Sequence, residues 1–323
     1  MQIFKINEAS DIVGLRIRHF GIKIICVGVG GVGYKVMSHI QSIEQACIKL
    51  IAIDTEPLEN MAIVKKNKKT LSFPNIEPEQ GEYAEIGDAL DGADIVFIIT
   101  AFGGKTGTTI SPIIAYIAEQ VGALTIPIIS MPSEFEDRKR FKLAMDGLES
   151  IKEKSDSVII IQNEDYKTIE DAYTQVIFGI YGILVSSREN DINIDYSDIY
   201  TIMKNKGMAL VYTGEYKGEN AASIAINNAI KSADFDNKSM GKAMGALIHI
   251  SMHSDYSLID ISEAIEIINE GVHCEAEVIF GTSTDENIAE NYIKVTIILT
   301  GFEQKYSNLI YDVPLVPPPS KRN

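Results

Sequence analysis

Two glycine-rich segments of the chain have the residue types that hold a phosphate. The first, Gly28 to Gly33, follows the apolar stretch 22–27, and the second reads Gly103-Gly104-Lys105-Thr106-Gly107-Thr108-Thr109 after the apolar stretch 95–99. Glycines let backbone N–H groups point at an anion without interference from a Cβ atom. The threonine hydroxyls and one lysine add donors and a positive charge. The spacing predicts an anion, above all a phosphate, at a helix N-terminus.

The residues after the second segment set where its helix should begin. Ser111 and Pro112 precede apolar residues at helical spacing. Serine is a favoured N-cap and proline a favoured first helical residue. We therefore expect the helix to begin at Pro112, with Ser111 as its cap.

The first segment also fits a dinucleotide fingerprint. A strand over 22–27, the glycines, a helical segment and a second strand over 50–53 lead to Asp54. In that interpretation, Asp54 binds a ribose hydroxyl. Glycines can also merely form a tight turn between strand and helix. With both strands and the acid in place the pattern favours nucleotide binding, without saying which nucleotide.

A third segment, Asn193-Ile194-Asp195-Tyr196-Ser197-Asp198, places two acids three residues apart. If a helix begins at Tyr196, Asp195 lies near its N-cap and Asp198 lies in its first turn. Capping then accounts for one of the two acids. The second acid and the polar residues before it remain open to another role.

The element pattern predicts an α/β fold. Strands and helices alternate about five times in the first half, which is typical of a Rossmann-like parallel sheet with helices on both faces. The glycine-rich loops and three other loops fall at strand ends, where such sheets bind ligands. Pro127 lies within a predicted strand and indicates a bulge or a sheet edge. Residues 169–185 form a helix that is apolar all round and should be buried between two domains.

The second half has strands without a phosphate loop and predicts a smaller α+β domain. We divide the chain into an N-terminal extension (1–20), a nucleotide-binding domain with the central helix (21–187), a C-terminal α+β domain (188–302) and a proline-rich tail (303–323).

Composition narrows the possible partners. The 323 residues are 46% hydrophobic and carry a net charge of -16, which disfavours nucleic acid and anionic membranes. No apolar run is long enough to span a membrane and no signal peptide opens the chain, so we expect a cytoplasmic protein without direct membrane insertion. Three unclustered cysteines fit a reducing compartment. His249 and His253 are four residues apart, but their context does not predict a metal site.

The second glycine segment is similar to the Gly-Gly-Gly-Thr-Gly-Thr-Gly signature of the tubulin/FtsZ family, and Asn193 to Asp198 resembles the loop by which one FtsZ subunit completes its neighbour's GTPase site. The resemblance extends from about Ile22 to Phe302. It implies a cytoplasmic cytoskeletal GTPase that binds GTP and GDP, with Mg²⁺ or K⁺ as candidate ions, and polymerises head to tail. Another FtsZ and a membrane adaptor are further candidate partners.

The resemblance also implies a role for each matching residue. Asp195 and Asp198, with Asn193, would reach the γ-phosphate of the next subunit and polarise the attacking water. Glu136 and Arg140 would contact ribose and phosphate, Asn163 the nucleoside, and Asp171 the guanine. The other nucleotide-binding positions are Gly30, Gly31, Gly33, Gly103, Gly104, Lys105, Thr106, Gly107, Thr108 and Pro132.

The chain departs from the family pattern at several positions. Lys105 and Thr109 replace glycines of the signature, and Lys35 stands where FtsZ usually has asparagine. The 73–81 segment lacks the usual Gly-Ala-Gly loop for the γ-phosphate. Lys105 can contact a phosphate oxygen, partly in place of a metal ion, or point to solvent.

Three functions are consistent with these residues. The first is an FtsZ-like GTPase that forms filaments, which retention of both Asp195 and Asp198 favours. The second is a weakly hydrolysing or non-hydrolysing GTP-binding scaffold or regulator, which the altered signature favours. The third is an NAD-dependent oxidoreductase, which leaves Gly103 to Thr109 and Asn193 to Asp198 without a role.

Overall fold

A ten-stranded sheet runs through the whole molecule. The structure is a computed structural model and describes residues 2–5, 22–42, 48–54, 80–132, 137–161, 168–185, 191–204, 206–231 and 240–302. Within these residues the strand order is β1-β3-β2-β4-β5-β6-β7-β10-β8-β9. The strands are β1 (Gln2–Lys5), β2 (Ile24–Val29), β3 (Lys49–Asp54), β4 (Ile95–Ala101), β5 (Leu124–Ser130), β6 (Ser157–Ile161), β7 (Gly207–Lys217), β8 (Gly245–Met252), β9 (Glu277–Thr284) and β10 (Tyr292–Phe302).

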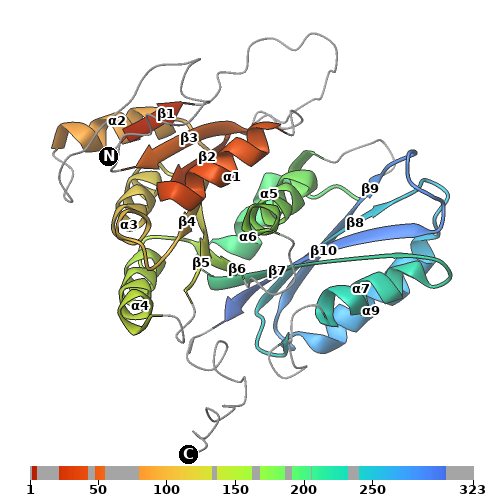
Figure 1. Cartoon of the computed structure of the whole chain (residues 1–323). Helices are drawn as coiled ribbons and strands as arrows, with labels where there is room; N and C mark the ends of the chain where they lie inside the picture. The colour runs from red at the N-terminus through yellow and green to blue at the C-terminus, as the bar shows by residue number, and fades with distance from the viewer. Residues whose placement is uncertain are drawn as a thin grey trace, which may run out of the picture.

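Helices cover both faces of this sheet (Figure 1). They are α1 (Gly30–Ser42), α2 (Gln80–Leu90), α3 (Lys105–Gln120), α4 (Arg138–Lys152), α5 (Ile169–Val185), α6 (Tyr196–Met203), α7 (Ala221–Lys231) and α9 (Leu258–Gly271). The pairs from β3 to β7 through β2, β4, β5 and β6 are parallel, whereas β10 is antiparallel to both β7 and β8. A parallel half followed by a mostly antiparallel α+β half confirms the predicted fold class.

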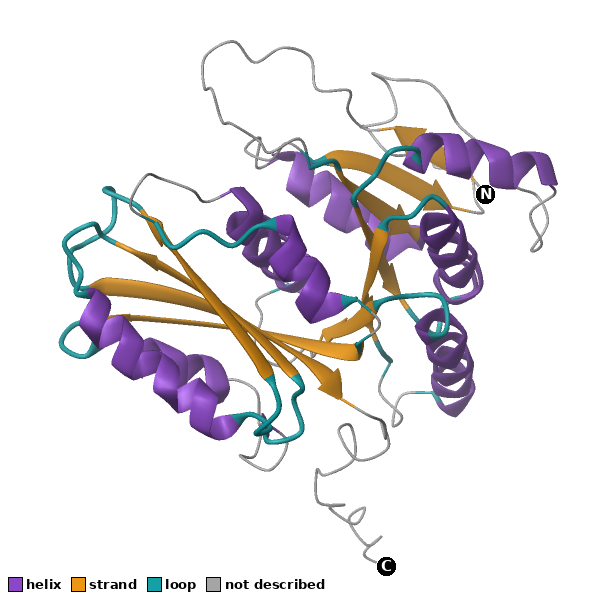
Figure 2. Ribbon diagram, turned by 180° about the vertical axis from the view of Figure 1, so that it is seen from behind, coloured by secondary structure: helices purple, strands orange, loops and turns teal. Residues whose placement is uncertain are grey.

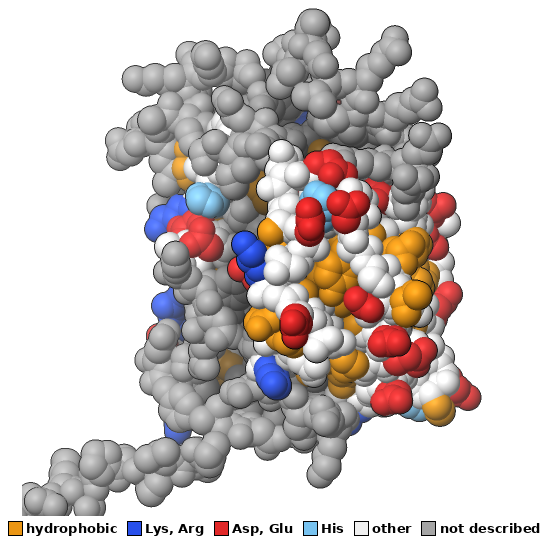
Figure 3. Space-filling model, turned by 90° about the vertical axis from the view of Figure 1, so that its right-hand side faces the viewer, with side chains coloured by type: hydrophobic (Ala, Val, Ile, Leu, Met, Phe, Trp, Pro, Cys, Tyr) orange, Lys and Arg blue, Asp and Glu red, His pale blue; other side chains and the backbone are white. Residues whose placement is uncertain are grey.

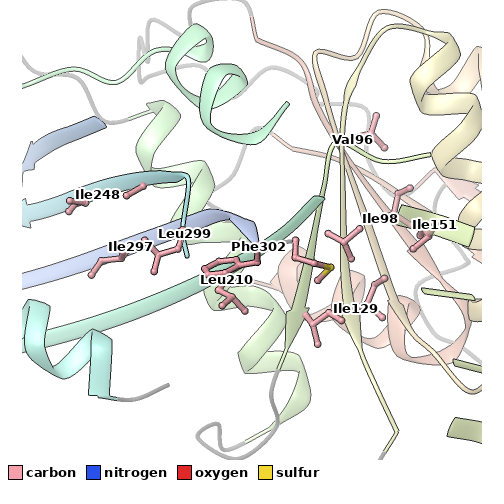
Figure 4. Packing of buried hydrophobic residues seen from close by; sticks show 14 of the residues in the cluster. Val96, Ile98, Ile129, Ile151, Leu210, Ile248, Ile297, Leu299 and Phe302 are labelled. Atoms are coloured by element: carbon pink, nitrogen blue, oxygen red, sulfur yellow. The ribbon is translucent and has the colours of Figure 1, made fainter. Parts of the chain in front are cut away.

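Alternating strand residues divide the core into two layers. In β2, Ile25, Val27 and Val29 face the layer that also holds apolar residues of α2, α3, α4, α7 and α9. Ile24 and Cys26 face the opposite layer, with residues of α1, α5 and α6. Figure 2 shows the sheet and the helices on its two faces from behind. The first layer is continuous from the β4–β5 region to β7, β10 and β8 (Figure 4), so the two halves share one core.

The central helix α5 begins and ends where the sequence predicts, at Ile169 and Val185. It lies between the two halves of the molecule (Figure 1). Its fully buried Tyr173 connects two strand ends, because the hydroxyl accepts from Ser130 N at 2.8 Å and donates to Thr100 O. Burial raises the pKa of the Tyr173 phenol well above its usual range. α5 is thereby fixed to the carboxyl ends of β4 and β5.

The predicted start of α3 is wrong. The helix begins at Lys105 with Gly104 as N-cap, and Pro112 lies inside it. Thr108 N already donates to Gly104 O at 3.1 Å, so the glycine-threonine segment is itself the first helical turn. Ser111 is fully buried rather than at the helix end. The Ser-Pro pair was a misleading signal because this chain places it one to two turns into the helix.

The predicted bulge or edge at Pro127 is also wrong. β5 is an interior strand, and its register with β4 runs from Leu124 to Ser130 without a shift. Pairing with β6 begins only at Ile128, one residue beyond the proline. Pro127 is tolerated where β5 is not yet paired on both sides. Within the predicted N-terminal extension, Gln2–Lys5 forms the edge strand β1, antiparallel to β3.

We expect Tyr173→Phe to destabilise the fold by about 1–3 kcal/mol, since it removes two buried hydrogen bonds, one from Ser130 N and one to Thr100 O. Urea unfolding of the two proteins measures the difference. An unchanged midpoint would show that this hydroxyl does not fix α5 to the strand ends.

Candidate functional site

The two glycine-rich segments meet at the carboxyl ends of β2 and β4. A Cβ atom on Gly30 would lie 3.6 Å from Gly107 N and 3.7 Å from Thr106 Cβ. The first turns of α1 and α3 are therefore neighbours, and the positive ends of both helix dipoles face the same region. This confirms that loops 70 residues or more apart in sequence converge on one edge of the sheet.

Close backbone contact makes this convergence possible. A Cβ on Gly33 would lie 2.6 Å from Ile99 O, and one on Gly107 would lie 2.5 Å from both Ala101 O and Thr100 Oγ1. No side chain fits at these distances, so α1 and α3 need glycine where they press on β4.

Two other glycines of the segments have open space beside them. A Cβ on Gly31 or on Gly104 would meet no atom within 4 Å, and both residues are exposed. Lys105, also exposed, is the first residue of α3. Backbone donors, a helix N-terminus and one cation thus border a space that an anion can fill.

Thr108 has its polar groups inside the loop. Its Oγ1 accepts from Gly103 N at 2.9 Å, its N–H donates within the helix, and the residue is 4% exposed. Thr108 therefore holds the loop in shape. Gly103 is in turn flanked by Pro132 and Arg140, whose Cγ and backbone O would lie 3.0 and 3.2 Å from a Cβ at Gly103.

Arg140 is held at this position by the start of α4. Asp137 is the N-cap, and its Oδ1 accepts from Lys139 N at 2.8 Å and from Arg140 N at 3.3 Å. The structure thus brings Arg140 and Pro132 to the second glycine segment. Glu136 and Asn163, predicted for ribose and nucleoside, lie outside the described residues.

Asp171 lies in the first turn of α5, and its Oδ1 is 3.6 Å from His39 Nε2 of α1. Both line a cavity of about 450 Å³ between α1, α5 and strands β7, β8 and β10. The cavity continues to His249 and Thr296, so Asp171 stands at its α1 end. Its predicted contact with guanine stays a prediction.

The acidic segment forms a complete capping box at the start of α6. Asp195 Oδ1 accepts from Ser197 N at 2.7 Å, Ser197 Oγ at 2.6 Å and Asp198 N at 3.2 Å, while Asp198 Oδ2 accepts from Asp195 N at 2.9 Å. Capping thus accounts for both acids, and the expectation that it explains only one is wrong. The hydrogen bond from the Ser197 hydroxyl, followed by that from Asp198 N, holds the pKa of Asp195 below its usual value.

One carboxylate oxygen of Asp195 is not used in the cap. All three capping bonds go to Oδ1, and Asp195 and Asn193 are both exposed. The carboxylate is ionised and exposed, and its Oδ2 takes no part in the cap.

This acidic segment lies at the opposite edge of the sheet from the glycine segments. Tyr196 Oη donates at 3.2 Å to the carbonyl of Asp94, the residue just before β4, whereas Gly103 follows the other end of that strand. β4 has seven residues, so its ends are about 23 Å apart. Asp195 therefore cannot reach the glycine segments of its own chain.

Known proteins are similar to this chain in sequence and in fold. The sequence profile "Tubulin/FtsZ family, GTPase domain" matches residues 23–171, and "FtsZ family, C-terminal domain" matches residues 207–303. The cell division protein FtsZ of Helicobacter pylori is 31% identical over 94% of this chain and 86% of its own length. This chain belongs to the tubulin/FtsZ family. The GTPase domain of that family binds GTP and GDP.

Further relatives of the tubulin/FtsZ family support the match along the whole fold. Cell division protein FtsZ 1 of Thermococcus kodakarensis is 32% identical, covering 88% of this chain and 82% of that protein. The solved structure "FtsZ dimer, empty" from M. jannaschii aligns with a TM-score of 0.70 at 28% identity, over 87% of this chain and 88% of that one. Among the described helices of this chain, none is long and apolar enough to cross a membrane.

Several positioning residues were missed by the sequence analysis. Tyr173 gave no signal, because its two partners lie 43 and 73 residues away. Asp137 could have been found, since an aspartate just before a basic helical segment is an N-cap signature. Asp156 accepts from Thr125 N at 2.9 Å and pairs with Lys204 at 2.7 Å, which ties the end of α6 to the sheet.

His249 on β8 is buried in the wall of the cavity, with 6% exposure. Desolvation lowers its pKa to about 4, although Asp191 opposes the shift; Lys294 adds to it. Asp171 and His39 line the same cavity. His249 is therefore neutral at neutral pH.

Because the folded-state pKa of His249 is below its unfolded value, its stabilising contribution is complete above about pH 6.5 and is lost as the pH falls to about 4. We expect the wild type to lose about 3 kcal/mol of unfolding free energy over this range relative to His249→Val. Urea unfolding at stepped pH measures it, with Thr296→Val as the non-titrating control. If the free energies of unfolding of wild type and His249→Val changed equally with pH, the lowered pKa of His249 would be contradicted.

Proposed function

We propose that this protein is an FtsZ-like GTPase that assembles head to tail, in which the Asp195 segment of one subunit completes the nucleotide site of the next. The observation that carries the proposal is the separation of the two halves of the site. The glycine segments and the Asp195 segment lie at opposite ends of β4, a strand about 23 Å long. In a head-to-tail polymer, these two ends face each other across each contact between subunits.

The glycine end suits the phosphates of GTP. Gly31 and Gly104 leave open space beside two helix N-termini, and Lys105 adds a charge that can neutralise a phosphate oxygen. Arg140 and Pro132 border the second segment. Mg²⁺ or K⁺ would supply further charge neutralisation when bound to the phosphates.

The acidic segment, at the opposite end of β4 from the glycine segments, suits a residue that orients water. The Oδ2 atom of the exposed Asp195, which the cap does not use, can accept a hydrogen bond from a water molecule, while the capping bonds to Oδ1 fix the carboxylate. Its lowered pKa keeps it charged and makes it a weak base, so we infer that it acts mainly by orientation and electrostatics. Asp198 holds Asp195 in place through the capping box, and Asn193 is exposed beside it.

The surface charge is consistent with a specific partner. Figure 3 shows acidic side chains spread over the face at the β9 side of the molecule, with hydrophobic groups among them. With a net charge of -16, loose association between copies is electrostatically unfavourable. A bound nucleotide and matched surfaces must therefore drive assembly. A second FtsZ and a membrane adaptor remain candidate partners.

We expect Gly31→Ala and Gly104→Ala to weaken GTP binding at least about tenfold while changing the free energy of unfolding by no more than about 1 kcal/mol, because the added methyl group occupies space that only the phosphates would fill. Equilibrium binding of GTP, GDP and NAD measures the effect. Gly87→Ala in α2 is the control, since its Cβ meets only a side chain at 3.9 Å. Binding of NAD but not GTP would overturn the proposal.

We expect Asp195→Asn to lower GTP turnover about a hundredfold or more while still folding, because asparagine is also a good N-cap. Phosphate release and light scattering follow turnover and assembly together. GTP binding by the wild type with neither assembly nor turnover would favour the scaffold function instead.

Mixing variants tests whether the site is shared. Asp195→Asn keeps its glycine segments and Gly104→Ala keeps its acidic segment. At a GTP concentration that fills the site of Asp195→Asn but not that of Gly104→Ala, a mixture should therefore show more turnover than either variant alone. A mixture that stays inactive, although both variants enter filaments with the wild type, would contradict a site built from two subunits.

A further inference from the structure

The acidic segment is attached to a strand far from it in sequence. Among the strands of the described residues, β9 is the last in the order of the sheet and pairs with β8. On its other side Thr282 N donates to Ile192 O at 2.9 Å, and Ile192 N donates to Thr282 Oγ1 at 2.9 Å. Thr282 thus binds both backbone groups of a residue three positions before Asp195.

The neighbouring residues of β9 extend this contact. Thr284 Oγ1 donates to Asp191 Oδ1 at 2.6 Å. A Cβ on Gly281 would lie 2.5 Å from Ile194 Cγ1 and 2.6 Å from Ile192 O, so the segment lies directly on the glycine backbone. Ile194 itself is buried, with 6% exposure, in the core layer of α5 and α6.

We propose that Thr282 and Thr284 are positioning residues for GTP hydrolysis, which set the place of Asp195 by holding residues 191–194 on β9. The inference rests on the proposed function. α6 fixes Asp195 from one side through its capping box and buried face. β9 fixes the chain from the other side, so the carboxylate is held between two anchors before any neighbour arrives. Such pre-organisation matters because misplacement by about 1 Å can cost a hundredfold in rate.

A merely structural role for these threonines makes a different prediction. If they only cover the free edge of β9, their loss lowers stability and leaves the turnover of folded protein unchanged. If they position Asp195, the loss lowers turnover at unchanged affinity for GTP, because nucleotide binds at the opposite end of β4.

β9 supplies its own matched control. The hydroxyl of Ser283, between the two threonines, contacts Ser251 Oγ of β8 at 2.9 Å. Ser283→Ala therefore removes a hydroxyl of the same strand without touching residues 191–194. Thr282→Ser is the rescue variant, since it keeps the acceptor for Ile192 N.

The first measurement is hydrogen exchange of residues 191–195 in the nucleotide-free protein. In Thr282→Val we expect the Ile192 amide to exchange about threefold to tenfold faster, because its acceptor is gone. Ser283→Ala and Thr282→Ser should match the wild type. Unchanged exchange in Thr282→Val would overturn the proposal.

The second measurement is steady-state GTP turnover. In Thr282→Val and Thr284→Val we expect kcat to fall about tenfold to a hundredfold with KM unchanged. At a GTP concentration too low to fill the Gly104→Ala site, mixing either variant with Gly104→Ala should raise turnover above that of each variant alone. Faster exchange with wild-type kcat would overturn the positioning role. A wild-type protein without GTP turnover would refute the proposed function. The hydrogen-exchange measurement would still decide whether β9 holds residues 191–194.

Discussion

The site depends on contact between helix and strand that leaves no room for a Cβ atom. Gly33 of α1 and Gly107 of α3 both press on the end of β4. A Cβ atom on either glycine would lie only 2.5 to 2.6 Å from the nearest oxygen atoms of that strand. This contact brings two helix N-termini together, and their combined dipoles make the region attractive to an anion. Any larger residue at either position would push one helix away and divide the anion site.

The sheet then carries this region and the acidic segment as one rigid unit. β4 joins the two edges, Tyr173 fixes α5 to the strand ends beside the glycine segments, and Tyr196 fixes α6 to the residue before β4. Burial, helped by Asp94, raises the pKa of Tyr196 to about 12, so its hydroxyl remains a donor at any physiological pH. Because the first turns of α1 and α3 and the capping box of α6 are already formed in the single chain, assembly needs to pay for little reordering of these parts.

Local signals predicted the fold well because most elements follow apolar periodicity. The bounds of α5 and the N-cap role of Asp195 follow from residues a few positions apart. Contacts between residues far apart in sequence leave no such signal. Nothing in the sequence near Asp191 predicts its hydrogen bond with Thr284, 93 residues away. Ser111 and Pro127 misled because local preferences yielded to tertiary packing, at a buried position inside a helix and in an interior strand.

Lys105 departs from the family pattern by placing a positive charge at the N-terminus of α3. A lysine at the first position of a 16-residue helix opposes the helix dipole and costs about 0.3–1 kcal/mol by itself. The first turn of α3 has no acidic residue to offset this cost. A bound phosphate makes the contribution of Lys105 favourable, since the positive charge of the lysine then attracts the ligand. An exposed lysine beside the open space at Gly104 is therefore more consistent with a phosphate contact than with a side chain that serves only solvent.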